Sequence, residues 1–312
     1  MQDKDSTQQS LLGFLNKKSE NSNYLEIKRN QNQKFKTVVD VPHPFLKWAG
    51  GKRQLISQMD QYFPKKFNKY IEPFIGGGAI FFYLLPENAI LVDINKDLIN
   101  SYNVVKNDVA NLIESLKKHK NEKEYYYKIR SVDRDPEIFD EWSDTEKASR
   151  TIYMNRCCFN GLYRVNSKGE FNVPFGKYKN PKFCDKENLL AVNKALKNVS
   201  VIHASFEKCL DFAQEEDFIY FDPPYVPISK SANFTSYTKD NFGKEDQLKL
   251  FDVFKELDHR GCKVMLSNSY SEFIAELYEE YQIKELKAKR AINSDASKRG
   301  AIKELLILNE LG

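Results

Sequence analysis

The chain has 312 residues, of which 41% are hydrophobic and 29% are charged, and its formal net charge is +4. This ordinary globular composition suits one large domain or two, and any nucleic-acid surface must come from locally clustered charge. The five cysteines form no Cys-x-x-Cys pair and only four histidines are present, which argues against a metal site or a disulfide framework. Because no apolar run is long enough to span a membrane and the N-terminus lacks a signal-peptide core, we expect a soluble cytoplasmic protein without a membrane partner.

The first 41 residues are rich in Asn, Gln, Lys and Ser and have almost no apolar periodicity. Such a composition cannot bury enough surface to offset the entropy that ordering would cost. We expect residues 1–41 to form a flexible, solvated extension, and the folded part to begin at Pro42.

The folded part opens with Phe45-Leu-Lys-Trp-Ala-Gly-Gly-Lys52. Gly50 and Gly51 predict a tight turn in which backbone amides approach a ligand, and Lys52 follows at the start of a predicted helix. A helix N-terminus beside a lysine suits a carboxylate. Trp48 either covers a cofactor here or belongs to the core.

A glycine-rich loop follows the first predicted strand. That strand begins at Tyr70 and leads into the three glycines at 76–78, and a helix is expected over 79–85. A second strand, over 89–92, ends in Asp93, an acid within about 20 residues of the glycines and so placed to bind ribose hydroxyls. This order of elements indicates a nucleoside cofactor, and the departure from the G-x-G-x-x-G pattern argues against NAD. A glycine turn that serves packing alone is the alternative.

The pattern then changes. Helices are expected over 108–118 and 145–156, followed by a β-hairpin whose turn is 166–169. Between residues 156 and 182, six lysines and arginines accompany the single acid Glu170. A basic, aromatic hairpin of this kind is a candidate for entering a DNA groove, and an ordinary basic solvent face is the alternative.

Strand character returns at 199–203, and Ser205 and Phe206 follow, where they would border an adenine ring. The next strand, 218–221, ends in Asp222-Pro-Pro-Tyr225. The two prolines forbid both strand pairing and helix, so the chain leaves as a rigid, extended loop. A carboxylate, a carbonyl and an aromatic ring are thereby held at the carboxyl end of a strand, where open α/β sheets bind their ligands.

These groups suit the activation of a nucleobase amine, whose lone pair is delocalised into the ring. Accepting both N–H bonds, on Asp222 and on the Pro223 carbonyl, would free that lone pair. Tyr225 would stack on the base, and its π face also attracts a sulfonium cation. An acidic strand end followed by an ordinary proline turn is the alternative.

Taken together, the motifs resemble those of the Dam-type DNA adenine-N6 methyltransferases, and the DpnII-type modification methylases of that family look most similar. The matching segments are Phe45–Lys52, Glu72–Gly78, Val92–Asn95, Asn160–Arg164, Phe171–Gly176 and Asp222–Tyr225. The resemblance covers about residues 42–310, and the first 41 residues have no counterpart in it.

The resemblance implies S-adenosylmethionine as methyl donor and adenine in duplex GATC as target, with base flipping and direct in-line transfer to N6. It also implies the modification component of a restriction-modification system, functionally paired with a restriction endonuclease. The catalytic residues are then Asp222, Pro223, Pro224 and Tyr225. The residues implied for the cofactor are Trp48, Gly50, Gly51, Lys52, Glu72, Pro73, Phe74, Gly76, Gly77, Gly78, Asp93, Ile94, Ser205, Phe206 and Asp222. Those implied for DNA are Lys47, Phe159, Asn160, Leu162, Arg164, Asn172, Pro174, Lys177, Tyr178 and Asn233.

Two of the DNA residues carry distinct roles by the same resemblance: Phe159 would wedge the base stack, and Arg164 would read a guanine edge. Lys177 departs from the family pattern, because the relatives carry arginine there. Lysine cannot form the bidentate fork of arginine, so this contact is expected to be weaker or to reach only a phosphate.

We therefore expect an α/β fold, a Rossmann-like S-adenosylmethionine-dependent methyltransferase core at 42–105 and 199–312. A helical and hairpin target-recognition domain at 106–198 would be inserted into it. Two rivals are an amine methyltransferase acting on cytosine N4 or on RNA, and a non-catalytic DNA-binding protein that kept the fold. Further elements are expected at 244–257 (helix), 264–268 (strand), and 283–286 with 305–308 (a closing strand pair).

Overall fold

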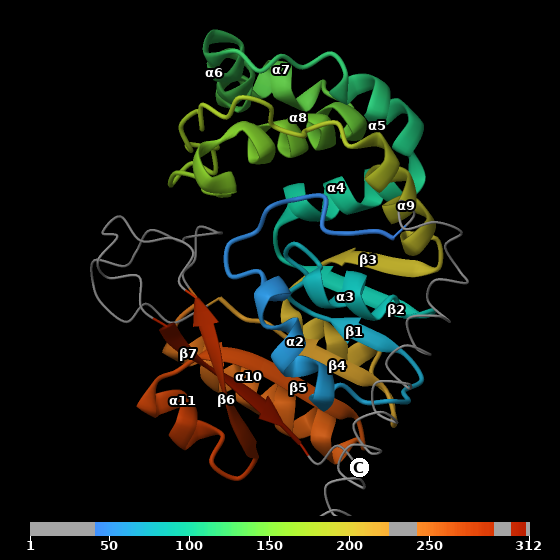
Figure 1. The fold of residues 1–312 in the computed structure, drawn as a ribbon, viewed down its shortest axis with the longest axis vertical. Coiled ribbons are helices and arrows are strands. Elements are labelled where there is room, and N and C mark those ends of the chain that lie inside the picture. The colour runs from blue at the N-terminus through green and yellow to red at the C-terminus, as the bar shows by residue number, and fades with distance from the viewer. Residues whose placement is uncertain (1–40, 225–241, 290–300, 310–312) are drawn as a thin grey trace, which may run out of the picture. The chain divides into compact units, whose positions relative to one another are not determined.

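The computed structural model describes residues 41–224, 242–289 and 301–309 (Figure 1). The residues from His43 onwards form one contact unit. The extension expected at 1–41 lies outside the described residues except for Val41. Tyr225 and Asn233 lie outside them as well.

Seven strands in the described part of the chain form one sheet in the order β3-β2-β1-β4-β5-β7-β6 (Figure 1). The first five of these are mutually parallel, and β7 runs antiparallel to both of its neighbours. The strands predicted for the core are confirmed, including the closing pair, whereas the arms of the predicted hairpin form no strands. The bounds are β1 Tyr70–Glu72, β2 Ala89–Asp93, β3 Val199–His203, β4 Phe218–Phe221, β5 Lys263–Ser269, β6 Gln282–Lys289 and β7 Ala301–Leu308.

The central strands are apolar on both sides because both faces of the sheet are covered. Side chains alternate between faces along a strand, so Phe218 and Tyr220 of β4 enter one core cluster while Ile219 and Phe221 enter the other. All four are fully buried. The central position of β4 in the sheet therefore requires the continuous apolar run before Asp222.

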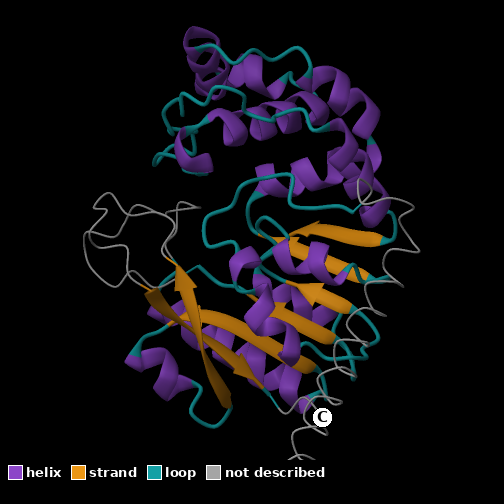
Figure 2. Cartoon of the chain, viewed as in Figure 1, coloured by secondary structure: helices purple, strands orange, loops and turns teal. Residues whose placement is uncertain are grey.

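Helices cover the two faces (Figure 2). The first core cluster takes side chains from α2, α3, α4 and α9, and the second takes them from the 3₁₀ helix η6 and from α10 and α11. The helices predicted after the glycine loop and at 244–257 are confirmed. The bounds are α2 Ile56–Met59, α3 Ala79–Leu84, α4 Lys96–Asn107, α9 Lys186–Leu196, η6 Phe206–Asp211, α10 Lys244–His259 and α11 Glu272–Leu277.

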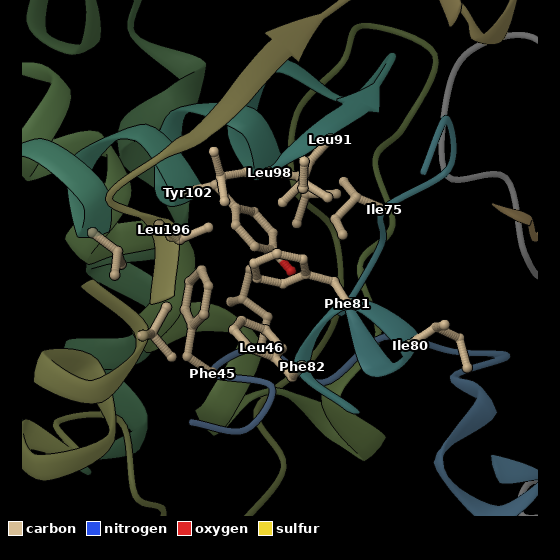
Figure 3. Packing of buried hydrophobic residues seen from close by; sticks show 14 of the residues in the cluster. Phe45, Leu46, Ile75, Ile80, Phe81, Phe82, Leu91, Leu98, Tyr102 and Leu196 are labelled. Atoms are coloured by element: carbon tan, nitrogen blue, oxygen red, sulfur yellow. The ribbon is translucent and has the colours of Figure 1, made fainter. Parts of the chain in front are cut away.

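The first folded residues are anchored in the first core. Phe45 and Leu46 are buried beside the phenylalanines of α3, and the Phe45 ring meets the Tyr102 ring edge-on at 4.9 Å between centroids (Figure 3). This burial fixes the segment that carries Lys47 and Trp48.

A predominantly helical region lies beyond α4 (Figure 1). It has a core cluster of its own that includes Tyr126, Tyr153 and Phe171, although α5 and α8 also contribute to the first core. Its predicted helices are confirmed, and the division of the chain at 106 and 198 stays a prediction. The bounds are α5 Val109–Leu116, α6 Lys123–Ser131, η4 Val132–Arg134, α7 Pro136–Asp140, α8 Asp144–Cys157 and η5 Phe159–Gly161.

The predicted hairpin is confirmed as a turn held by few backbone bonds. Asn166 N donates to Glu170 O at 2.9 Å and Asn172 N to Arg164 O at 3.0 Å. Its arms pair only through isolated bridges, of which Val165 with Phe171 is one.

The sheet reverses its winding between β1 and β4. From β1 the chain continues to β2 and β3 on one side, and β4 and β5 are added on the other side. Open α/β sheets bind ligands in the crevice at such a switch point, outside the carboxyl ends of the strands. The glycine loop leaves β1 there and Asp222 leaves β4 there.

Candidate active site

Asp222 is held at the end of β4 by two donors that share one of its oxygens. Lys52 Nζ donates to Oδ1 at 2.6 Å, and Ser267 Oγ donates to the same atom at 3.2 Å. The Lys52 side chain is 2% exposed, whereas that of Asp222 is 20% exposed. One carboxylate oxygen is thus bound from the protein side while the group as a whole reaches the crevice.

The surroundings make Asp222 a more basic carboxylate than usual. Burial raises its pKa, and the charge and hydrogen bond of Lys52 and the hydrogen bond of Ser267 oppose the rise. Burial alone would lower the pKa of Lys52, but the charges of Asp222, Tyr220 and Glu304 raise it above its ordinary value. Lys52 is therefore a cation, and Asp222 is a strong hydrogen-bond acceptor.

Two residues of this network were not anticipated from the sequence. Ser267, in β5, also shares a hydrogen bond of 2.8 Å with Tyr220 OH, and Glu304 Oε2, in β7, lies 3.7 Å from Lys52 Nζ. Both lie in strands on the far side of β4. In the sequence, Glu304 stands out only as a carboxylate directly before the predicted apolar strand 305–308.

The sequence-predicted turn before Lys52 is present. Gly51 N donates to Trp48 O at 3.2 Å, and the Gly50 carbonyl accepts a second bond from Lys52 Nζ at 2.9 Å. The helix that follows is the short 3₁₀ helix η2, Lys52–Gln54. The lysine ammonium, rather than a helix N-terminus, is the cationic group that this segment brings to the site.

Pro223 is buried and Pro224 is half-buried directly after Asp222. Among the described residues, none donates a hydrogen bond to the Pro223 carbonyl. The role predicted for Tyr225 concerns a residue outside the described ones.

Asp93 lies at the end of β2 and binds the glycine loop. Gly76 N donates to Oδ2 at 3.2 Å and Asn95 N donates to Oδ1 at 2.9 Å. Burial raises the pKa of Asp93 to about 6, although these backbone N–H groups oppose the rise. Each oxygen keeps acceptor capacity beyond its one backbone bond.

The glycine at 76 has a packing reason inside the protein. Its φ is +45°, and a Cβ there would lie 2.7 Å from Cδ1 of Trp48. Tyr102 OH donates to the Gly76 carbonyl at 3.2 Å. Packing inside the protein therefore requires glycine at position 76, independently of any ligand that the loop contacts.

Trp48 also connects the site to the helical region. Its indole stacks on the ring of Tyr163 at 5.4 Å and 27°, and Tyr163 OH donates to Asp97 Oδ2 at 2.7 Å. Asp97 belongs to α4 of the core and Tyr163 follows η5. Neither residue was anticipated from the sequence, because a tyrosine and an aspartate in these places carry no distinguishing pattern.

Glu72, at the end of β1, is buried and accepts a hydrogen bond of 2.8 Å from Tyr70 OH. Burial raises its pKa well above the ordinary value, and the charges of Asp222 and Asp93 add to the rise. The charges of Asp93 and Asp222 thus reach Glu72 from the two strands beside β1.

The remaining cofactor candidates flank this acidic group. Phe74 stacks on Phe206 at 5.4 Å and 24°, and Pro73 is buried before it. Ser205 donates its hydroxyl to the nearby Glu207. Ile94 is 57% exposed beside Asp93, which is unusual for so apolar a side chain.

The DNA candidates that the structure describes gather around η5 and the hairpin. Phe159 N donates to Pro174 O at 2.8 Å, which joins the two segments, and the Phe159 side chain is 51% exposed. Arg164 Nε donates to Asn172 Oδ1 at 2.6 Å. Asn160, in the left-handed region at φ 55°, is exposed, and Leu162 is half-buried beside it.

Lys47 and Tyr178 join this cluster. The Lys47 ammonium lies 4.5 Å from the centre of the Tyr178 ring, and a Cβ at Gly161 would lie 2.4 Å from Cδ of Lys47. Asn155 clamps the same segment, since its side chain accepts from Lys47 N and donates to Lys47 O, both at 2.8 Å. Lys177 is exposed, with φ 56°.

Other kinds of site find little support in the described ranges. No group of three or more His, Cys, Asp or Glu side chains there is arranged to hold a metal ion. All five cysteines are free thiols. Among the helices that the structure describes, none is both long enough and apolar enough to cross a membrane.

Comparison with known proteins gives the family. A family model described as D12 class N6 adenine-specific DNA methyltransferase matches residues 48–292. A type II methyltransferase of Lactococcus lactis subsp. cremoris, M1.LlaDCHI, is 49% identical over 270 residues, covering 85% of this chain and 95% of the relative. M.MjaIII of Methanocaldococcus jannaschii is 48% identical over 286 residues, covering 85% and 98%. The DNA adenine methylase of Haemophilus influenzae is 40% identical over 272 residues, covering 85% and 93%. The seven-stranded sheet is thus a Rossmann-like methyltransferase core, and the chain belongs to the D12 class of N6 adenine-specific DNA methyltransferases.

Proposed function

We propose that this enzyme transfers a methyl group from S-adenosylmethionine to N6 of adenine in duplex DNA, at GATC. The observation that carries the proposal is the state of Asp222. Lys52 and Ser267 both bind Oδ1, and Oδ2 accepts no hydrogen bond from any described residue. A fixed, basic carboxylate oxygen is thereby available in the crevice at the switch point of the sheet.

Asp222 Oδ2 would accept one N–H of the adenine amine, and the Pro223 carbonyl would accept the other. These two bonds draw hydrogen towards the protein and release the nitrogen lone pair from the ring. Because Lys52 and Ser267 fix the carboxylate in advance, little reorganisation is needed when charge develops on the amine. The proton that the amine loses would be held by Asp222, whose pKa burial raises.

S-adenosylmethionine, when bound, supplies an electrophilic methyl group on a sulfonium cation. The residues present fit it, because the carboxyl groups of Glu72, Asp93 and Asp222 meet at adjacent strand ends with one buried lysine among them. Asp93 would accept hydrogen bonds from the ribose hydroxyls. Phe206 and the exposed Ile94 offer apolar surfaces for the adenine ring of the cofactor.

Residues 106–198 would form the target-recognition domain. Arg164 donates a hydrogen bond to Asn172 through Nε, and its two terminal nitrogens donate to none of the described residues. A guanidinium in this state can donate both terminal groups to O6 and N7 of a guanine. The exposed Phe159 would fill the stack from which adenine is flipped.

The biological setting belongs to the same proposal. Two of the relatives are named type II methyltransferases, and others are named DNA adenine methylases. The higher identity lies with the type II enzymes, which supports a modification role beside a restriction endonuclease.

The test is transfer of labelled methyl from S-adenosylmethionine to short duplexes that carry GATC or one altered base pair. We expect label on the GATC adenine alone. Label on every duplex that contains adenine would keep the chemistry and refute the GATC specificity. Label on cytosine, or on single-stranded RNA at a rate equal to duplex DNA, would favour the corresponding rival substrate.

A further inference from the structure

Outside the proposed catalytic crevice, the helical region contains a buried ion pair between Asp133 and Arg150 that binds the recognition hairpin. We call this ion pair the clamp. Asp133 Oδ2 accepts a hydrogen bond from the backbone N–H of Phe171 at 2.7 Å and forms an ion pair with the NH2 group of Arg150 at 2.8 Å. The two side chains are 9% and 4% exposed. Asp133 belongs to η4 and Arg150 to α8, so the hairpin is bound from two elements at once.

Arg150 also binds the helix α6, which precedes η4. Its Nε donates to Ile129 O at 3.0 Å, and its NH2 group donates to Arg130 O at 2.8 Å. These carbonyls lie in the last turn of α6, and the Ile129 carbonyl also accepts the backbone N–H of Val132. The guanidinium therefore fixes α6, α8 and η4 relative to one another.

The carbonyl of Val173 in the hairpin is bound by side chains as well. Tyr126 OH donates to Val173 O at 2.9 Å, and Arg130 NH1 donates to the same oxygen at 3.3 Å. The segment from Phe171 to Val173 is thus bound on both sides of Asn172. Since the hairpin arms share few backbone bonds, these contacts from outside determine where this segment lies.

Asn172 is the residue that orients Arg164. Its side-chain oxygen accepts from Arg164 Nε at 2.6 Å, and its backbone N–H donates to Arg164 O at 3.0 Å. Fixing Nε fixes the plane of the guanidinium, and with it the direction of the two terminal nitrogens. Any shift of the segment that carries Asn172 would turn that plane.

We propose that Asp133, through Arg150 and the Phe171–Val173 segment, positions Arg164 for reading a base pair and so sets the sequence discrimination of the enzyme. This inference rests on the proposed function of the hairpin in DNA recognition. Asp133 and Arg150 are positioning residues, because neither faces DNA: both are buried beneath the hairpin.

The chemistry of the clamp favours a role in precision over one in stability alone. Oδ1 of Asp133 and Nε of Arg130 are buried and have no hydrogen-bond partner among the residues that the structure describes. Such groups cost free energy, and a buried ion pair can often be replaced by apolar residues without loss of stability. A charge-assisted bond to a backbone N–H holds the position of that backbone more tightly than an apolar contact does.

The experiment measures the ratio of initial methylation rates on a GATC duplex and on duplexes with one altered base pair. Arg164→Ala first identifies the base pair at which Arg164 discriminates. Asp133→Asn then removes the charge of the clamp and keeps its shape. Tyr126→Phe removes one donor to Val173 O. Arg134→Gln serves as a matched control, because the ion pair that Arg134 forms with the hairpin, to Glu170 at 3.7 Å, is partly exposed.

We expect Asp133→Asn to lower discrimination at the Arg164 base pair about tenfold, the scale of a lost bidentate contact. Discrimination at the other base pairs and affinity for S-adenosylmethionine should stay at the wild-type level. Tyr126→Phe should act in the same direction and more weakly, and Arg134→Gln should change nothing. In the Arg164→Ala background, Asp133→Asn should have no further effect within about twofold, because its effect passes through Arg164.

Three results would overturn the inference: unchanged discrimination in a folded Asp133→Asn protein, an equal loss of rate on all duplexes, or additive effects with Arg164→Ala. If circular dichroism shows that Asp133→Asn does not fold, Tyr126→Phe decides, and wild-type discrimination in that variant overturns the inference. A wild-type enzyme that prefers no duplex would instead refute the proposed function, and with it this inference.

Discussion

The seven-stranded core and the helical region hold their proposed functional residues by different means. In the core, Asp93 and Asp222 follow directly from the parallel strands β2 and β4, whose pairing sets their positions. In the helical region, the residues around Arg164 lie on irregular backbone with isolated bridges and positive φ angles at Asn160 and Lys177. There, side chains that bind backbone groups take over the task that strand pairing performs in the core.

The difference between the two regions predicts which substitutions alter the transfer step and which alter sequence discrimination. A strand end moves little when one neighbour is changed, so core substitutions should affect the transfer step through the chemistry of the group that is lost. Side-chain clamps are individually removable, so substitutions in the helical region should affect discrimination through geometry. Four substitutions and one change of pH test this distinction between the two regions, and they follow in order of decreasing expected effect.

Asp222→Asn should lower the single-turnover rate of methyl transfer about a thousandfold, because it removes the preorganised acceptor of the amine. Affinity for GATC duplex, measured by fluorescence anisotropy, should stay near the wild-type value. Asp211→Asn, which changes an exposed carboxylate on η6, is the control and should leave the rate unchanged. Normal turnover by the Asp222→Asn protein would refute the assignment of this residue.

Lys52→Met should lower the free energy of unfolding by about 3 kcal/mol, because it leaves Asp222 and Glu304 without their buried cation. Urea unfolding measures this loss. Lys117→Ala, which breaks an exposed pair with Glu114 in α5, should cost no more than about 1 kcal/mol. Equal losses in the two variants would mean that the core network does not depend on Lys52.

Arg164→Ala should reduce discrimination at one base pair by about 1–3 kcal/mol and leave transfer on the preferred duplex much less affected. Competition between matched and altered duplexes measures the reduction. Lys168→Ala, at the exposed turn of the hairpin, should weaken all duplexes alike. A uniform loss in Arg164→Ala as well would assign Arg164 to phosphate contact.

Affinity for S-adenosylmethionine should rise about tenfold between pH 5 and pH 7, because Asp93, with a pKa of about 6, accepts ribose hydroxyls better when ionised. The carboxyl of Glu72 and the imidazole of His203 face the same group. Calorimetric titration should show that Asp93→Asn flattens this dependence and that His203→Gln retains it. A dependence that survives in Asp93→Asn would point to Glu72.

Lys177→Arg should have the smallest effect, a severalfold gain in affinity for duplex DNA, because arginine adds a planar fork where lysine offers a point charge. The gain should be larger on GATC than on an altered duplex if the fork reaches a base. An equal gain on all duplexes would identify the contact as one to phosphate. Lys179→Arg, a neighbouring exposed lysine, is the control.

The parts of this protein that repeat a short pattern could be predicted from the amino-acid sequence. The apolar run 218–221 before Asp222 and the run 89–92 before Asp93 are buried strands because central parallel strands must be apolar on both faces. Glycines and prolines marked the loops that follow, and the hairpin turn at 166–169 was recognisable by the same means. The helix α4, Lys96–Asn107, was not predicted, although its buried residues Leu98, Tyr102 and Val105 recur at helical spacing.

Contacts between residues far apart in the chain could not be predicted in this way. Lys52 and Asp222 are 170 positions apart and still form the ion pair of the site, and Ser267 and Glu304 join them from strands placed beside β4 by the sheet order. No sequence motif marks Asp133 or Arg150, and it is the helix packing that buries both beneath the hairpin. Local patterns encode strands and turns because those depend on neighbouring residues. Charge networks depend on which elements pack together, and that follows from the whole fold.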